Sequence, residues 1–188
     1  MGAIRSPRPV QPICGLISSD PDLMRRAVAL LARHCGEPDA QSELWPFDST
    51  DYYEPEMGPG LQRMFVAFGR LMDPGGLRDL KILTNDLERR ISRDLGLPEQ
   101  RRTVNLDPGY MALSKLVLAT TKDHAHRVYL GGGIYAECTL RYEHARWVPW
   151  PWTYPDYADE RYHRFFTEVR ERYQARLQDL TSARGNPA

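Results

Sequence analysis

The segment from Val128 to Leu140 alternates apolar and polar residues around three consecutive glycines at 131–133, and few structures other than a β-hairpin suit this pattern. A three-residue loop at the glycines pairs Leu130 with Ile134 and keeps each class of residue on its own face. A two-residue loop would bring apolar and polar side chains onto the same face. The sequence therefore predicts a hairpin with a three-residue loop.

This register places Tyr129 opposite Tyr135 and Arg127 opposite Glu137. The face expected to be buried carries Val128, Leu130, Ala136 and Cys138. On the polar face, the pairing of Arg127 with Glu137 has two interpretations. It is a charge pair that stabilises the hairpin by ~0.2–1 kcal/mol, or it belongs to the floor of an active site in which Glu137 is an acid, a base or a metal ligand.

Upstream of the hairpin, capping and turn residues divide the chain into alternating strands and helices. Asp20 is placed to cap a helix that has Pro21 at its first position and stops at Gly36. The strands are expected at 13–18, 44–47, 64–71 and 103–106, with a second helix over 77–95. This β-α-β-β-α-β order is that of a ferredoxin-like split βαβ unit.

Downstream, the segment 111–121 fits either a strand or a short helix, and both remain open. The aromatic segment Trp147–Tyr157 contains three prolines and is expected to be an irregular loop, followed by an amphipathic helix over 159–180. The predicted class is α+β, a ferredoxin-like βαββαβ core extended by a C-terminal β-hairpin and a final amphipathic helix. We expect one domain over residues 13–181, between disordered tails at 1–12 and 182–188.

Charge and cysteine usage narrow the classes of partner. Lys plus Arg and Asp plus Glu both number 25, so no broad positive field attracts nucleic acid. No apolar run approaches the ~18 residues that a membrane span needs. No membrane partner is therefore expected. Three widely spaced cysteines, Cys14, Cys35 and Cys138, indicate reduced thiols in a cytoplasmic protein. The oligomeric state stays unknown.

Four segments carry a resemblance to a known family: 104–110 (VNLDPGY), 115–122 (KLVLATTK), 133–140 (GIYAECTL) and 152–157 (WTYPDY). With Tyr52-Tyr53-Glu54 and Thr84-Asn85 upstream, they resemble the family catalogued as domain of unknown function 4416, from about Cys14 to Tyr173. That family consists of uncharacterised bacterial proteins without an established activity. The resemblance therefore implies membership and no mechanism.

Residues 104–108, Val-Asn-Leu-Asp-Pro, are also similar to a pentapeptide of the GPN-loop GTPases. Those enzymes cradle the nucleotide phosphates in a P-loop, and the sequence contains no GxxxxGK[ST] motif. The pentapeptide alone is consistent with a GTP-binding label but supplies no phosphate cradle.

Basic and hydroxyl side chains gather between Lys115 and Arg141, where they could hold an anion. The ligand-binding candidates are Lys115, Thr121, Lys122, His126, Arg127, Tyr129, Thr139 and Arg141, with Glu137 and Asp107 as catalytic candidates. The alternative is a solvated strand connection with ordinary surface charge. His124, His126 and Cys138 could form a zinc site, although the parity of the strand favours buried or capping histidines.

Four carboxylates lie in one polar loop: Asp48, Asp51, Glu54 and Glu56. Clustered carboxylates can hold Mg²⁺ or Ca²⁺, so a divalent cation is the one cofactor the sequence suggests. The spacing does not match an EF-hand, and a solvated acidic loop is the competing interpretation.

These residues support two functions. The first is an enzyme or binding protein for a small phosphorylated or nucleotide-like ligand, held in a concave pocket where Lys115, Arg127 and Glu137 meet. The second is a non-catalytic interaction module that binds protein or RNA through the WTYPDY loop and a flat, polar sheet face. Whether the chain is an enzyme is left open at the level of sequence.

Overall fold

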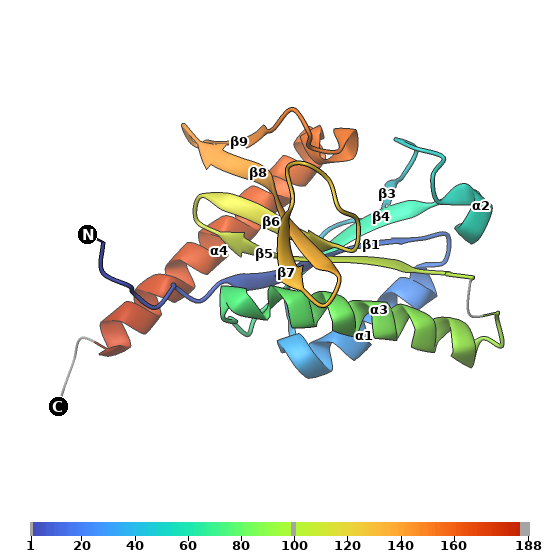
Figure 1. Cartoon of the computed structure of the whole chain (residues 1–188), viewed down its shortest axis with the longest axis horizontal. Coiled ribbons are helices and arrows are strands. Elements are labelled where there is room, and N and C mark those ends of the chain that lie inside the picture. The colour runs from blue at the N-terminus through green and yellow to red at the C-terminus, as the bar shows by residue number, and fades with distance from the viewer. Residues whose placement is uncertain (1, 99–100, 185–188) are drawn as a thin grey trace.

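The computed structural model describes residues 2–98 and 101–184, and one large β-sheet organises them (Figure 1). The strands are β1 (Gln11–Ser18), β2 (Pro38–Gln41), β3 (Trp45–Pro46), β4 (Gln62–Phe68), β5 (Asn105–Ala112), β6 (Lys115–Thr120), β7 (Val128–Gly131), β8 (Ile134–Glu143) and β9 (Arg146–Pro149). The helices are α1 (Pro21–Cys35), α2 (Glu54–Met57), α3 (Leu77–Asp94) and α4 (Glu160–Arg184), with 3₁₀ turns at Pro74–Gly76 and Pro155–Ala158.

The strands follow the order β2-β4-β1-β5-β6-β8-β7, with β3 beside β4 and β9 beside β8. Each of these pairings is antiparallel. Helices α1 and α3 cover one face of the sheet, and α4 crosses the other face (Figure 1). The predicted α+β class is confirmed, as a large antiparallel sheet with helices on both faces. None of the helices in the described ranges is long and apolar enough to cross a membrane.

The capping signals of α1 are confirmed. The Asp20 side chain accepts a hydrogen bond from the backbone N–H of Asp22, at 2.8 Å, and Pro21 occupies the first turn. Gly36 ends the helix with φ of 82°, in the left-handed region where a side chain is strained. The resulting helix presents an apolar stripe to the sheet.

The boundaries differ from expectation in several places. α2 and most of β9 lie in segments expected to be loops, and β2 forms where no element was predicted. β1 begins at Gln11, within the expected tail. At the other end α4 is helical to Arg184. The ambiguous segment 111–121 is extended, because β5 continues through Pro108 to Ala112 before turning into β6. β6 pairs with β5 only from Gly109 onward, so Pro108 lies where the ladder to β6 has ended.

The hairpin forms, but its faces are not as predicted. Tyr129 pairs with Tyr135 as expected, but the predicted three-residue loop is wrong. An irregularity at Leu130 brings Gly131, in place of Leu130, opposite Ile134, so two residues form the loop. The expected buried set fails because Val128 is 67% exposed, and Leu130, Ala136 and Cys138 are only half-buried. Glu137 and Thr139, expected on a polar face, are buried instead. A further irregularity near Thr139 reverses the alternation of β8, and both faces of the sheet are covered at this point.

All three cysteines are free; Cys14 and Cys35 are buried and Cys138 is half-buried. Burial raises the pKa of the Cys35 thiol to about 11, partly offset by the charge of Arg70. Burial raises the pKa of the Cys14 thiol as well, so these two buried thiols are protonated and unreactive at neutral pH.

The close approach of β5 and β6 at Gly109 generates a stability prediction. A Cβ added there would lie 2.3 Å from the backbone oxygen of Val117, which cannot move without displacing β6. Gly109→Ala should lower the free energy of unfolding by about 1–3 kcal/mol or more. Urea unfolding measures it, and Gly76→Ala, where no atom lies within 4 Å, should change it by about 0.5 kcal/mol or less. Equal effects of the two substitutions would contradict the assignment.

Candidate functional site

A cavity of about 560 Å³ opens where β5 and β6 separate, on the face of the sheet that α4 covers further along. The sheet supplies its floor, and three loop segments supply its walls: 47–53, 120–127 and 154–157. Five cationic side chains line it: Arg63, Lys81, Arg102, Lys122 and Arg127. Three carboxylates accompany them: Asp107, Glu137 and Asp156. Pockets of this size bind small molecules in many proteins.

Arg63 ties the floor to the aromatic loop. Its Nη1 donates to Oδ2 of Asp107 at 3.1 Å, and its Nη2 donates to Oδ2 of Asp156 at 3.0 Å. The guanidinium also lies over three rings, with its carbon 4.9 to 5.6 Å from the centroids of Phe47, Phe65 and Tyr157. The Arg63 side chain is only 4% exposed, so the ion pairs act in a largely water-free environment.

Gly15 on β1 makes this arrangement possible. It pairs with Phe65 on one side and Asp107 on the other, directly beneath the path of the Arg63 side chain. A Cβ at position 15 would lie 2.7 Å from Nη1 of Arg63. The guanidinium can therefore cross β1 from β4 to β5 only because this position has no side chain.

The two carboxylates that share Arg63 have opposite pKa shifts. Burial would raise the pKa of Asp107, but the charges of Arg63 and Lys81 outweigh it and hold the pKa below its ordinary value. Burial raises the pKa of Asp156; Arg63 opposes the rise, the charge of Asp107 adds to it, and the pKa stays above its ordinary value. Carboxylates separated in this way are suited to different protonation roles.

A second ion-pair group supports the inner end of the cavity. Arg102 donates to both carboxylate oxygens of Glu56, at 3.1 and 2.7 Å, and to Oδ1 of Asn105 at 2.7 Å. Lys81 donates to the backbone oxygen of Leu106 at 2.9 Å. Glu88 accepts from the backbone N–H of Leu106 at 2.6 Å, and burial raises the pKa of its carboxyl despite the nearby Lys81. The start of β5 is thus held by charged side chains of α3.

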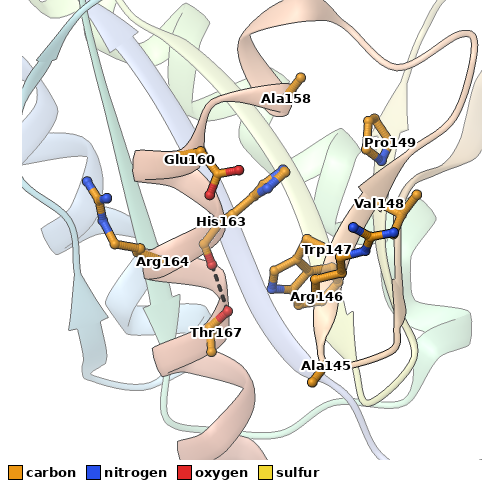
Figure 2. Close-up of a pocket in the computed structure, with 10 residues that line it drawn as sticks. All are labelled: Ala145, Arg146, Trp147, Val148, Pro149, Ala158, Glu160, His163, Arg164 and Thr167. Carbon is orange, nitrogen blue, oxygen red and sulfur yellow. Dashed lines mark hydrogen bonds between the residues drawn. The ribbon is translucent and has the colours of Figure 1, made fainter.

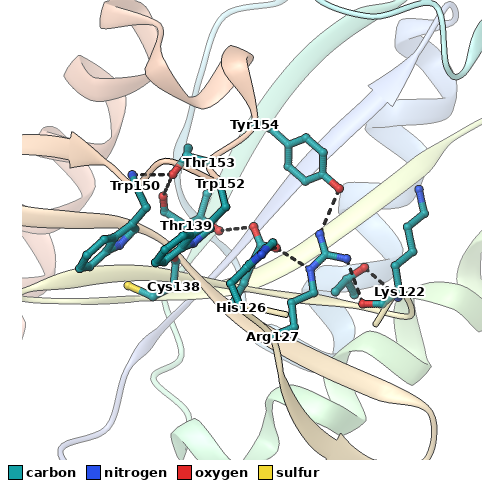
Figure 3. Close-up of polar contacts among 11 residues, drawn as sticks. Lys122, His126, Arg127, Cys138, Thr139, Trp150, Trp152, Thr153 and Tyr154 are labelled. Carbon is teal, nitrogen blue, oxygen red and sulfur yellow. Dashed lines mark hydrogen bonds and ion pairs between the residues drawn. The ribbon is translucent and has the colours of Figure 1, made fainter. Parts of the chain in front are cut away.

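The pair Arg127–Glu137 forms a third buried group (Figure 3). Nε of Arg127 donates to Oε2 of Glu137 at 2.7 Å, and the two side chains are 2% and 3% exposed. The rest of the guanidinium donates to the backbone oxygen of Lys122 and to the hydroxyl of Tyr154, at 2.9 and 3.1 Å. This geometry rejects the interpretation as a surface hairpin staple, because the pair is buried beside the cavity.

A column of stacked side chains lies behind Glu137. Nε2 of His126 is 3.3 Å from Oε2 of Glu137, and the Thr139 hydroxyl donates to Oε1 at 3.2 Å. The column consists of His124, His126, Trp152, Trp150 and Arg141, with successive aromatic rings 5.1 to 5.9 Å apart and nearly parallel. Figure 3 shows Trp150 and Trp152 beside His126. The stack joins the connection between β6 and β7 to the aromatic loop.

Lys122 lies at the mouth of the cavity. Its Nζ is 4.0 Å from the centroid of the Tyr52 ring, on the opposite wall. Among the described residues no carboxylate lies within ion-pairing distance of this ammonium, whereas each arginine of the cavity has a carboxylate partner. The mouth therefore carries a cation that is free to pair with a ligand.

The structure brings together part of the predicted site. Asp107, Thr121, Lys122, Arg127 and Glu137 border the cavity. His126 and Thr139 contact Glu137 from behind.

Three other candidates lie elsewhere, and their assignment to this pocket is wrong. Lys115 is exposed at the far end of β6, opposite Arg141. Arg141 pairs with Glu143 at 2.9 Å and covers Trp150. Tyr129 is 59% exposed and packs against Tyr135 with the two rings tilted by 50°. An extended strand advances by about 3.3 Å per residue, so Lys115 and Lys122 lie at opposite ends of β6 and do not reach the same pocket.

The acidic loop does not assemble into a cation site. Glu56 is engaged by Arg102, while Asp48, Asp51 and Glu54 are exposed. Within the described part of the chain, no group of three or more His, Cys, Asp or Glu side chains is arranged to hold a metal ion. Among the described residues, His124, His126 and Cys138 also form no zinc site; His126 is stacked on His124 and directed to Glu137.

Sequence reasoning missed Arg63, Lys81, Arg102 and Tyr154, and did not include Asp156 among the candidate site residues. Lys81, Thr84 and Glu88 fall on the same helical face as Leu77 and Ile91, so charged residues within an apolar stripe were a readable signal. Arg63 directly precedes the buried run of β4. Nothing in the sequence shows that Arg63 meets Asp107 and Asp156, because these residues lie 44 and 93 positions away from it along the chain.

A second hollow, of about 630 Å³, lies between β9 and the start of α4 (Figure 2). It contains Arg146, Glu160, His163 and Arg164, and none of the predicted site residues. His163 is engaged with the backbone oxygen of Tyr157 at 2.8 Å. Most of its charged side chains are exposed, and those named here form no buried ion pair. The hollow therefore lacks the buried charges that characterise the cavity at Arg63.

Comparison with known proteins identifies the family. The profile described as "Domain of unknown function (DUF4416)" matches residues 8–173, most of the chain, and the chain belongs to this family. No curated protein and no solved structure matches it.

The burial of Arg127 and Glu137 generates a stability prediction. Arg127→Gln leaves Glu137 buried beside His126 without its guanidinium, and should lower the free energy of unfolding by about 3–5 kcal/mol. The matched control is Arg78→Gln, which removes an exposed, solvent-screened pair with Asp79 and should leave the free energy of unfolding nearly unchanged. Chemical unfolding at neutral pH measures both. A cost for Arg127→Gln as small as the control would show that the pair is solvated.

The opposite pKa shifts of Asp107 and Asp156 predict opposite pH trends. The charged form of Asp107 stabilises the fold above its ordinary pKa of about 4, and this contribution is lost as pH falls through its lowered pKa. The contribution of Asp156 is present below about pH 4 and lost as pH rises through its raised pKa. Between about pH 7 and pH 3, the cost of Asp107→Asn should shrink while the cost of Asp156→Asn grows. Parallel trends in pH-dependent unfolding would contradict the assignment.

Proposed function

We propose that this member of the DUF4416 family binds a small phosphorylated or nucleotide-like ligand in the cavity between β5 and β6. The observation that carries the proposal is the ammonium of Lys122, which has no carboxylate partner among residues 2–98 and 101–184 and lies at the mouth of a cavity lined by five cations and three carboxylates. An anionic group placed there would complete a charge pair without breaking an existing one.

The chemistry of the mouth suits a phosphate group. Thr120 and Thr121 lie beside Lys122 on the same connection, and Ser49 and Thr50 face them from the opposite wall. Hydroxyl groups and an ammonium are common donors to phosphate oxygens. Tyr52 and Tyr53 provide aromatic surface on which a base or sugar could lie.

A chemical step in this cavity would use the carboxylates on its floor. Asp107 is held ionised by Arg63 and Lys81, so it can accept hydrogen bonds from a ligand or stabilise developing positive charge, whereas its lowered pKa makes it a weak proton acceptor. Glu137 borders the same cavity and is fixed by Arg127 and Thr139. An enzyme and a pure binding protein would share this arrangement, and turnover assays separate the two.

The interaction-module alternative has less support. Tyr154 and Asp156 of the WTYPDY segment bond inward, to Arg127 and Arg63. The polar residues Glu137 and Thr139 are buried, so they present no flat surface to a partner. Trp152 and the ring of Tyr154, at 39% and 46% exposure, remain the aromatic parts of this segment available to another macromolecule.

We also infer that the first half of the chain is a ferredoxin-like unit, supported by the order β2-β4-β1-β5 and by α1 and α3 on one face. A cytoplasmic location is supported by three free cysteines.

The proposal predicts that Lys122→Gln weakens binding of a phosphate monoester by about tenfold to a hundredfold, as expected for one charge-assisted hydrogen bond. Its control is Lys115→Gln, which removes an exposed lysine at the other end of β6 and should leave affinity unchanged. Isothermal titration calorimetry against adenosine 5′-monophosphate and sugar phosphates measures both. Equal affinity of the two variants would place the anion elsewhere, and no heat with any ligand would refute the proposal.

A further inference from the structure

The two ends of the cavity differ in charge and in exposure. Lys122 and Tyr52 are exposed at the mouth, whereas Arg63 and Tyr157 are buried at the inner end. Asp107 lies on the floor between β1 and the gap in the sheet, with 24% of its side chain exposed where it borders the cavity. A ligand that spans the cavity therefore meets an ammonium first and a carboxylate last.

Asp107 retains capacity to accept hydrogen bonds. Arg63 donates to Oδ2, and the nearby Asn105 side chain adds a hydrogen bond that helps to lower the pKa of this carboxyl, which leaves further lone pairs of the carboxylate for a ligand. Arg63 and Lys81 hold the group ionised, so both of its oxygens are acceptors at neutral pH. Beside it, the hydroxyl of Tyr157 is buried without a hydrogen-bond partner among the described residues. Buried polar groups are rarely left unpaired.

This inner end also disfavours some ligands. A second phosphate or carboxylate there would approach Asp107 and Asp156, and the guanidinium of Arg63 already bonds to both. The other cations of this end are also engaged, Arg102 by Glu56 and Lys81 by the backbone oxygen of Leu106. An alkyl chain would cover Asp107 and strip it of solvent without offering a donor, which costs free energy. Hydroxyl groups are the neutral donors that satisfy an ionised carboxylate, as ribose hydroxyls do in nucleotide-binding proteins.

We infer that the cavity is selective for a polyhydroxylated phosphate monoester, such as a sugar phosphate or mononucleotide, with its phosphate at Lys122 and its hydroxyl groups on Asp107. The inference rests on the proposed function and adds the ligand's orientation and the specificity-determining role of Asp107. It requires donors on the part of the ligand remote from the phosphate, and it excludes a bisphosphate with anionic groups at both ends.

The test is a calorimetric comparison of matched phosphates on the native chain. Ribose 5-phosphate, glycerol 3-phosphate and adenosine 5′-monophosphate carry hydroxyl groups, and butyl phosphate has a similar anionic group without them. The best of the hydroxylated ligands should bind at least about tenfold more tightly than butyl phosphate. Ribose 1,5-bisphosphate should bind no more tightly than ribose 5-phosphate.

Asp107→Asn then assigns the preference to this side chain. The substitution keeps the size of the group and leaves Arg63 paired with Asp156, and it should remove most of the preference for hydroxylated ligands. Asp79→Asn, an exposed aspartate that also pairs with an arginine, should preserve the preference. Thermal unfolding verifies that each variant is folded. If Asp107→Asn does not fold, the comparison of ligands on the native chain still decides the inference.

The outcomes separate the two proposals. If butyl phosphate binds as tightly as the hydroxylated phosphates, the specificity inference is overturned while phosphate binding stands. The inference is also overturned if Asp107→Asn and Asp79→Asn retain the preference equally. If none of the phosphates binds the native chain, the proposed function fails and the inference fails with it.

Discussion

The buried guanidinium of Arg63 connects three parts of the chain that are distant in sequence. It starts on β4, passes over the bare backbone of Gly15 and bonds to Asp107 on β5 and to Asp156 in the aromatic loop. Removing the guanidinium would leave two carboxylates in a largely dry environment, which is costlier than the pairs are stabilising. The floor of the cavity and its aromatic wall therefore share one support.

The gap in the sheet has an equally local origin. Pro108 has no N–H to offer a neighbouring strand, and the ladder between β5 and β6 ends at the adjacent Gly109. Beyond that point β5 stays with β1 while β6 stays with β8, so the two strands diverge. The Asp-Pro-Gly sequence at 107–109 thus places a carboxylate, a ladder break and a close strand contact in three consecutive residues.

Much of the fold was accessible from the sequence because its signals are local. The Asp20 cap, the Gly36 stop, the long helix after residue 76 and the Tyr129–Tyr135 pairing all depend on neighbours in the chain. The faces of the hairpin were not accessible, because strict alternation cannot anticipate irregularities at Leu130 and Thr139 or a sheet covered on both sides. Glu137 was chosen as a site residue for its polar position, yet it borders the cavity as a buried group.

The site was only partly accessible for the same reason. A run of basic residues in the sequence suggested one pocket, but the extended strand β6 places Lys115 far from Lys122. The other cations of the cavity come from other elements and are Arg63, Lys81 and Arg102. Long-range ion pairs of this kind leave only faint traces in a single sequence. The faint traces here are the charged residues at 81 and 88 on the inward face of α3.

The stacked column of His124, His126, Trp152, Trp150 and Arg141 has a mechanical consequence for the cavity. It clamps two of the three walls to each other, so that neither can swing outward without separating several aromatic contacts at once. The remaining wall, at 47–53, meets the clamped pair at its rim through the contact between Tyr52 and Lys122. Cation–π contacts at exposed sites are weak, about 0.5–1 kcal/mol. Two walls of the cavity are thus held in place and the third is held weakly. Opening the cavity beside Tyr52 therefore costs the least free energy, and a ligand would enter and leave there.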